Sequence, residues 1–259
     1  MKKWILGCLM LVCSVSASAE KNYKYRVSLK DKAGTVYSVD KPQEFLSERT
    51  LERRNRQQLS VDETDLPVSQ VYVDELKGLG AKLVTSSRWN NTVVLEVSDT
   101  LLMDEVAKKS FVKGVKKVWT QPDSIPPRNK KRGKEVTNDV KESGHYYGKA
   151  FRQINIHGGD SLHAAGFTGK GMHVAVIDAG FYNADKIKFF KKMDLHGTRD
   201  FVNPNSDIYA ENSHGMKVLS CMAANIKDVF VGTAPEASYW LLRSEDQDTE
   251  QPIEEDYWA

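Results

Sequence analysis

Two residues of this sequence, Asp178 and His214, have the types and surroundings that acid–base chemistry needs. Asp178 directly follows a short apolar run, residues 174–177, with glycines before and after it. That pattern is typical of a strand buried on both faces of a parallel sheet. Loops at the carboxyl ends of such strands converge on a crevice that holds catalytic groups. An Asp in this place is as common in a simple turn, so the interpretation needs a second residue.

His214 supplies that second residue. The segment 212–225 predicts a buried helix, with Ser213 as its N-cap and Asn225 as its stop, because apolar residues recur at helical spacing at Gly215, Val218, Leu219 and Met222. His214 then falls in the first turn. A helix N-terminus disfavours the charged imidazolium, which leaves a neutral ring able to accept a proton. The alternative is a histidine that only caps or packs.

Three motifs occur in a recognisable order: VAVIDAGF, NSHGMKVLSCMAAN and VGTAPEASYWLLRSE. Together they resemble the subtilisin-like serine proteases (subtilases), and the resemblance covers residues 146–259. It implies that Asp178 orients the histidine and that His214 is the general base that activates a serine, in the chain order Asp, His, Ser. The substrate implied is a peptide or protein.

The resemblance also has a gap. The segment of Gly-Thr-Ser-Met-Ala type that carries the nucleophile of the family, and the Asn of its oxyanion hole, have no counterpart before Ala259. We therefore expect residues 146–259 to form the N-terminal part of the catalytic domain, a partial doubly wound parallel α/β sheet. The chain by itself is expected to lack peptidase activity, because it has no serine to activate.

Residues 1–19 have the features of a signal peptide. Lys2 and Lys3 precede an apolar stretch at residues 4–15, and residues 17–19 form an A-x-A cleavage site. The apolar stretch is too short for a membrane span, so we expect a secreted, periplasmic or cell-surface protein with no span after signal removal. The net charge of +2 gives no reason to expect a nucleic-acid partner.

Residues 20–127 are expected to form a separate α+β domain. Residues 25–29 and 35–39 predict two strands around a turn at 31–34. Helix, strand, strand, helix and strand follow at residues 71–79, 81–86, 92–97, 101–108 and 115–119, most of a ferredoxin-like unit. In subtilases such a unit is a prodomain that assists folding and inhibits the enzyme, so the resemblance implies an intramolecular partner. An independent small domain is the alternative.

Two basic segments could either be simply exposed to solvent or have a function. Residues 128–145 begin with a basic run after Pro122, Pro126 and Pro127, which indicates an exposed linker, and we hypothesise that it is cut when the prodomain leaves. A second basic cluster lies in a helix-prone segment and could be a binding patch, but a solvated helix face is the preferred interpretation. It consists of Arg49, Arg53, Arg54 and Arg56.

The remaining polar residues carry no assigned chemistry. Residues 238–243 predict a second buried strand, and Pro252 the start of a helix. Cys221 is expected to be a buried, inert thiol, and solvent-facing positions are expected for His145, His157 and His163. No cofactor is expected. The resemblance allows a structural calcium ion, although the acids after the second strand lack ligand spacing and are expected to be solvated; they are Glu245, Asp246 and Asp248.

Three functions from different classes follow. The preferred one is an exported serine endopeptidase, present here as its prodomain and first catalytic part. The second is a non-enzymatic inhibitor or chaperone module formed by residues 20–127. The third is a metal-dependent hydrolase, which has enough ligand types but no recognised spacing; its ligands would be His173, Asp178, His196, Asp200 and His214.

Overall fold

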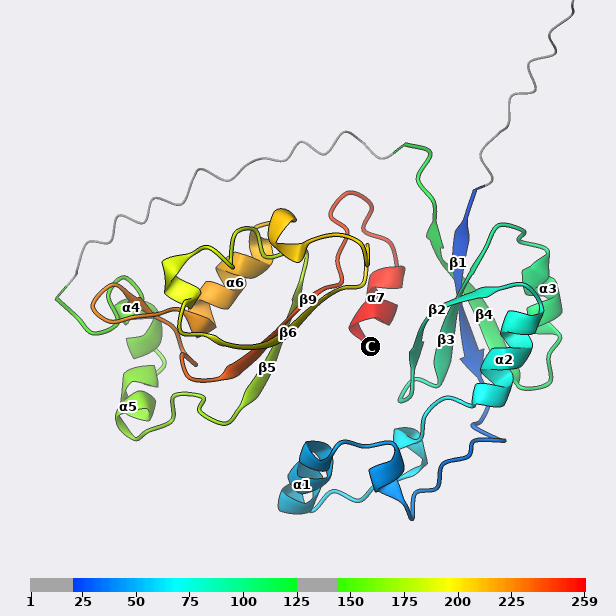
Figure 1. The fold of residues 1–259 in the computed structure, drawn as a ribbon, viewed down its shortest axis with the longest axis horizontal. Coiled ribbons are helices and arrows are strands. Elements are labelled where there is room, and N and C mark those ends of the chain that lie inside the picture. The colour runs from blue at the N-terminus through cyan, green and yellow to red at the C-terminus, as the bar shows by residue number, and fades with distance from the viewer. Residues whose placement is uncertain (1–20, 125–143) are drawn as a thin grey trace, which may run out of the picture.

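The structure is a computed structural model that describes residues 21–124 and 144–259. The predicted signal peptide at 1–19 lies outside the described residues, and so does nearly all of the predicted linker at 128–145. The described residues form two lobes, one around a four-stranded antiparallel sheet and one around a three-stranded parallel sheet (Figure 1). The chain is therefore a mixed α/β protein with sheets of both kinds.

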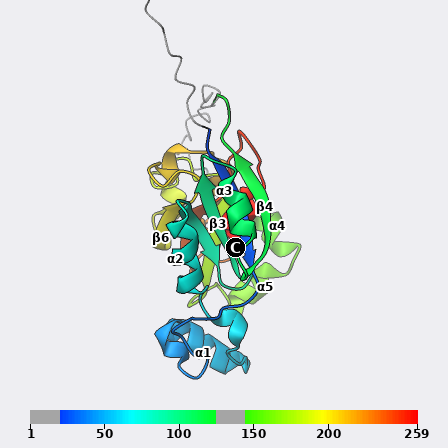
Figure 2. The same cartoon turned by 90° about the vertical axis from the view of Figure 1, so that its right-hand side faces the viewer.

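The first lobe has its helices on one face of its sheet. Its strands, in the spatial order β2-β3-β1-β4, are β1 (Tyr23–Leu29), β2 (Lys82–Ser87), β3 (Thr92–Val97) and β4 (Val112–Thr120). Both α2 (Gln70–Gly78) and α3 (Leu102–Ala107) lie against the same face (Figure 1, Figure 2). Val27, Leu76, Leu95 and Val106 are fully buried between these layers. All five elements predicted between residues 71 and 119 are therefore present.

The hairpin predicted for residues 25–39 is wrong. The turn forms, since the amide of Ala33 donates to Asp31 Oδ1 at 2.9 Å, but residues 35–39 leave the sheet and Val36 is 85% exposed. The reason is that β1 is a central strand whose two edges are already paired with β3 and β4. No edge of β1 remains for a local partner.

Residues 36–66 form an irregular arm with one α-helix. It contains η1 (Pro42–Glu44), α1 (Glu48–Gln57) and η2 (Glu63–Asp65), and none of the residues of α1 is buried. Ser47 caps α1, since its side chain accepts a hydrogen bond from the amide of Thr50. Arg54 differs from the solvated cluster that the sequence predicts, because it pairs with the fully buried Asp65. Arg49 reaches the second lobe and donates to the carbonyl of Gly171 at 2.9 Å.

The last helix, α7 (Ile253–Trp258), packs on the face of the four-stranded sheet opposite α2 and α3 (Figure 1). Ile253 and Tyr257 form a buried cluster with Val94 and Val118 of the sheet, whereas Trp258 stays 70% exposed. The sequence predicts this helix but gives no partner for its apolar side chains. The structure shows that the partner is the first lobe.

Polar contacts fix the same interface. Arg26 of β1 donates from Nη2 to Asp256 Oδ2 at 2.9 Å and to Glu255 Oε2 at 3.0 Å. Lys24 donates to the hydroxyl of Tyr257 at 2.9 Å, and burial raises the pKa of Tyr257 to about 12 while it lowers the pKa of Lys24. The interface therefore combines apolar burial with a paired, nearly buried charge.

Replacing Arg26 with methionine is expected to loosen α7. The Asp256 side chain is only 5% exposed, so it would lose its partner while remaining buried, at a cost of about 3–5 kcal/mol. Hydrogen exchange of the backbone amides of residues 253–259 measures the effect. Glu255→Gln is the matched control, because Glu255 pairs with the same arginine but its side chain is 69% exposed. Equal protection of α7 in Arg26→Met and the wild type would contradict the expectation.

The second lobe is built on three parallel strands. They are β5 (His173–Asp178), β6 (Asp194–Asp200) and β9 (Ser238–Arg243), with β9 in the middle of the order β5-β9-β6. The helix α6 (His214–Ala223) covers one face, where Val176, Leu219, Tyr239 and Leu241 form a buried core (Figure 1). This arrangement places the carboxyl ends of all three strands at one edge, together with the start of α6.

The prediction that residues 174–177 are buried on both faces is wrong. In β5 only the side toward α6 is buried, so Val176 is 4% exposed while the neighbouring Ala175 is an exposed residue. In β9, likewise, Trp240 on the other side is 39% exposed. The apolar run therefore reflects a strand at the edge of the described sheet, covered by a helix on one face.

Shorter elements complete the second lobe. They are α4 (Phe151–Asn155), α5 (Gly159–Ala164), η3 (Lys188–Phe190), η4 (Ile208–Ala210), and the two short antiparallel strands β7 (Asn225–Ile226) and β8 (Phe230–Val231). Among residues 21–124 and 144–259, none of the helices combines the length and the apolar character that a bilayer crossing requires.

Candidate active site

Asp178 ends β5 with its carboxylate in a buried position. The residue is 5% exposed, and its Oδ1 accepts a hydrogen bond from the amide of Ala179 at 2.7 Å. Its own carbonyl accepts from the amide of Ser244 at 3.1 Å, just after the parallel partner strand β9. The backbone on both sides of the carboxylate is therefore held, and the carboxylate faces the start of α6.

His214, the first residue of α6, lies against that carboxylate. Its Nδ1 is 2.9 Å from both Oδ1 and Oδ2 of Asp178, although the two residues are 36 positions apart. A carboxylate accepts only, so Nδ1 carries a proton, and in the neutral ring Nε2 presents a lone pair. The histidine side chain is 61% exposed, and Nε2 has no hydrogen-bond partner among the described residues. An oriented imidazole with a free, accessible nitrogen can accept a proton from a bound hydroxyl.

The cap of α6 differs from the predicted one. Ser213 occupies the N-cap position but makes no side-chain capping bond. Instead Asn212 Oδ1 accepts from the amide of His214 at 2.7 Å, one residue earlier than expected. Sequence reasoning missed this role, although Asn is as good a capping residue as Ser.

Two glycines allow the strand end and the helix start to touch. A Cβ on Gly215 would lie 2.6 Å from the carbonyl oxygen of Gly180 and 2.8 Å from Asp178 Cβ. A Cβ on Gly180 would lie 2.5 Å from the amide nitrogen of Asn212, and Gly180 also has a φ of 148°. The absence of these two side chains is what brings the Asp178 carboxylate within hydrogen-bond distance of His214.

A second carboxyl group lies near the pair. Burial raises the pKa of Glu245, the negative charge of Asp178 raises it further, and His214 lowers it. Glu245 follows β9 by two positions; the residue is exposed overall, so only part of its carboxyl group is shielded from solvent. The sequence predicts only a solvated loop here, and the charge coupling to the pair is a feature of the three-dimensional arrangement.

A buried arginine underlies the same edge of the sheet. Arg243, the last residue of β9, is 3% exposed and donates from Nη1 to Asp200 Oδ2 at 3.0 Å. Its Nε donates to the carbonyl of Ala179 at 3.0 Å, and its Nη2 lies 3.8 Å from Glu211 Oε2. Sequence reasoning missed Arg243 as well, because a single arginine ending an apolar strand has no distinctive spacing.

The five residues of the metal-hydrolase hypothesis do not meet. Asp178 and His214 form the pair above, and Asp200 is bound to Arg243. His173 and His196 lie on another part of the sheet, with ring centres 4.6 Å apart. His173 is exposed. Nowhere in the described part of the chain do three His, Cys, Asp or Glu side chains gather in a way that suits a metal ion.

Two other sequence expectations need correction. Cys221 is exposed, because it lies on the face of α6 that points away from the sheet. His163 is half-buried rather than solvent-facing, with its ring between the hydroxyl of Tyr147 at 3.1 Å and the carbonyl of Thr233 at 2.9 Å. His145 and His157 are exposed, as expected.

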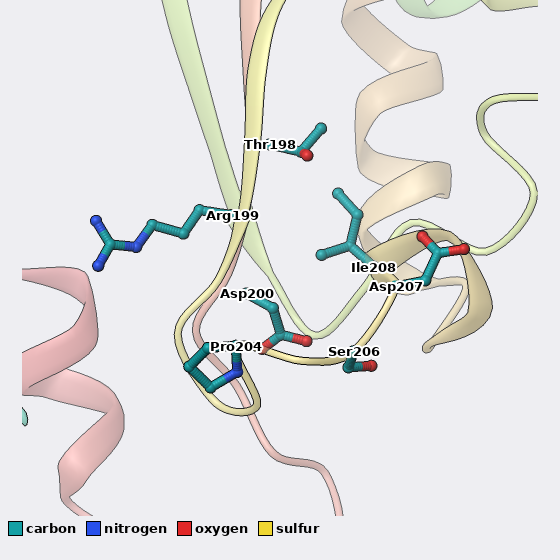
Figure 3. A pocket seen from close by; sticks show the side chains of 7 residues that line it. All are labelled: Thr198, Arg199, Asp200, Pro204, Ser206, Asp207 and Ile208. Carbon is teal, nitrogen blue, oxygen red and sulfur yellow. The ribbon is translucent and has the colours of Figure 1, made fainter.

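A polar cavity of about 340 Å³ opens beside β6 (Figure 3). Its lining consists of Thr198, Arg199, Asp200, Pro204, Ser206, Asp207 and Ile208. In Figure 3 the Arg199 side chain points away from the other labelled side chains. Neither member of the Asp178–His214 pair lines this cavity, so it is separate from the acid–base pair.

The comparison with protein families gives a match that covers the first lobe and continues into the residues after it. Residues 24–136 match the family model described as the peptidase S8 propeptide domain of Bacteroidota. The search among curated proteins gave no match.

Several solved serine proteases resemble the chain. MycP1, described as an essential component of the type VII (ESX-1) secretion system, is 24% identical with a TM-score of 0.30, over 44% of this chain and 28% of its own. EpiP from Staphylococcus aureus, which processes the epidermin leader peptide, is 12% identical with a TM-score of 0.45, over 89% of this chain and 44% of its own. This chain thus spans less than half the length of either structure. A TM-score below 0.5 does not establish a shared fold.

Proposed function

We propose that this chain, which carries a peptidase S8 propeptide domain and is related to the subtilisin-like serine proteases, belongs to an exported serine endopeptidase. The observation that carries the proposal is the contact between His214 Nδ1 and both oxygens of Asp178 at 2.9 Å, while no residue in 21–124 or 144–259 bonds to Nε2. In this proposal Asp178 orients the ring, and His214 takes the proton of a serine hydroxyl as it attacks the peptide carbonyl.

The proposal requires a serine at His214 Nε2. No described serine donates to that nitrogen. A serine outside these 259 residues is therefore part of the proposal, and so is an oxyanion hole to stabilise the tetrahedral intermediate. Substrates are peptides or proteins, and no cofactor takes part in the reaction as proposed.

The first lobe acts in this proposal as an intramolecular prodomain, residues 20–127, attached to a catalytic part at 146–259. The strand order β2-β3-β1-β4, with α2 and α3 on one face, supports its description as a ferredoxin-like unit. The docking of α7 on the open face supports an inhibitory or folding role within the same chain. The propeptide match supports export, and cleavage in residues 128–145 would separate the two parts.

An inhibitor or chaperone module without its own catalytic activity is the second candidate. The contact between the four-stranded sheet and α7 favours it, since this sheet face already binds a helix from a protease-like lobe. The two candidates differ in whether the Asp178–His214 pair ever acts on a substrate.

The test compares the 259-residue chain with the complete product of the reading frame that encodes it. We expect the complete product to hydrolyse casein and to react with a fluorophosphonate probe at a serine, and we expect neither from the 259-residue chain. A complete product that folds but shows neither activity would leave the inhibitor function. Hydrolysis by the 259-residue chain that His214→Ala removes would contradict the proposed position of the serine.

A further inference from the structure

Arg243 occupies the centre of the edge that holds the acid–base pair. It ends β9, the middle strand, and its side chain is 3% exposed. A buried guanidinium must be paired and hydrogen-bonded to be tolerated. Its partner carboxylate, on Asp200, is equally buried at 2% exposure and ends the neighbouring strand β6. The ion pair therefore joins the ends of two parallel strands.

The same guanidinium also holds the backbone next to Asp178. Arg243 and Asp178 are direct neighbours in the parallel register of β9 and β5. Nε of Arg243 donates to the carbonyl of Ala179 at 3.0 Å, while the amide of Ala179 donates to Asp178 Oδ1 at 2.7 Å. A single residue, Ala179, thus carries both the bond to the arginine and the bond that orients the carboxylate.

A third contact leads to His214. Nη2 of Arg243 lies 3.8 Å from Glu211 Oε2, and the Glu211 side chain is 9% exposed. Glu211 precedes Asn212, whose Oδ1 accepts from the amide of His214 at 2.7 Å. The segment that caps α6 is therefore held by the same cation as the strand end that carries Asp178.

We propose that Arg243 is a positioning residue, which fixes the separation of Asp178 and His214 by binding the backbone after one and the segment before the other. The planar guanidinium can hold its partners in three directions at once, whereas a lysine ammonium is a compact charge on a flexible stem. Arg243 touches no reacting atom. The effect of this role on catalysis rests on the proposed function, whereas the positioning of Asp178 and His214 can be tested without it.

The decisive variant is Arg243→Lys, which keeps the charge beside Asp200 but loses the fork. The readout is the proton resonance of His214 Nδ1–H, which a bond to a carboxylate moves strongly downfield and which His214→Ala identifies by its loss. We expect the resonance in the wild type and its loss or clear upfield shift in Arg243→Lys, while circular dichroism stays that of a folded chain. Arg199→Met is the matched control, because Arg199 is an exposed arginine on β6, one position before Asp200.

A second variant is needed in case the loss of Arg243 prevents folding. Arg243→Met alone would leave the Asp200 carboxylate buried without its cationic partner. We therefore combine it with Asp200→Asn, so that the double variant has neither charge. A folded double variant without the downfield resonance supports the proposal. An unchanged resonance in either Arg243→Lys or the double variant overturns it, and so does the failure of both variants to fold, since Arg243 would then serve the core alone.

Kinetics provide the readout that separates this inference from the proposed function. In the complete product, Arg243→Lys is expected to lower kcat about 100-fold with little change in KM, the size of effect that a 1 Å misplacement produces. If the complete product has no peptidase activity, the proposed function fails, while the resonance still reports whether Arg243 holds the pair. An unchanged kcat in an active product overturns the positioning role.

Discussion

Replacing Asp178 with asparagine is expected to lower kcat of the proposed endopeptidase by about 10⁴-fold, with KM nearly unchanged. The asparagine amide can donate a hydrogen bond to Nδ1 of His214. The neutral ring would then carry its proton on Nε2, and Nε2 could not accept a proton from a serine. His214→Ala removes the base altogether, and we expect a loss of about 10⁶-fold. Hydrolysis of a fluorogenic peptide over a range of concentrations measures both parameters.

The chain contains a matched control for this experiment. Asp194 and His196 form a second contact between a carboxylate and an imidazole, with 3.2 Å between Oδ2 and Nε2, at the start of β6. Both residues lie at the opposite ends of the strands from Asp178. Asp194→Asn and His196→Ala should therefore leave kcat unchanged. A loss of less than tenfold in Asp178→Asn, or equal losses in both pairs, would argue against the assigned roles.

Gly215→Ala is expected to destabilise the fold by about 1–3 kcal/mol and to separate the pair. The added methyl would lie 2.6 Å from the carbonyl oxygen of Gly180, 2.8 Å from Asp178 Cβ and 2.9 Å from Phe181 Cε1. Helix propensity alone predicts the opposite sign, a gain of up to about 1 kcal/mol for alanine in a helix. The sign of the change therefore reports the close packing of α6 on β5.

Urea unfolding and the His214 Nδ1–H resonance measure this prediction. Gly78→Ala is the control, because Gly78 lies in α2 and a Cβ there would meet no atom within 4 Å. We expect that control to be neutral or stabilising by up to about 1 kcal/mol. A Gly215→Ala variant as stable as the wild type, with its resonance retained, would show that the helix start tolerates a side chain.

Sequence patterns predict the pair of residues and the elements of the first lobe because those depend on local order. The helical spacing after His214 and the alternation of elements between residues 71 and 119 need no knowledge of distant partners. Asp178 and His214 come together because a strand end and a helix start share one edge, which topology alone predicts.

The features that the sequence does not predict depend on long-range packing. Residues 194–200, which form β6, contain three charged residues and a glycine, and no strand is predicted there from the sequence; β9 supplies the ladder that makes them a strand. Arg243 reads as the end of a strand until Asp200 and Glu211 are seen beside it. Burial of β5 was overestimated because its edge position follows from the strand order.

The docking of α7 has a consequence for maturation. A helix of six residues has little stability of its own, so α7 depends on the surface that the four-stranded sheet offers. Arg26 and Asp256 are 230 positions apart, and their bond does not pass through the linker. Hydrolysis of the linker would therefore leave two associated pieces. In the proposed protease, activation would then need a further event, dissociation or digestion of the bound sheet, after which Ile253 and Tyr257 would need new apolar neighbours.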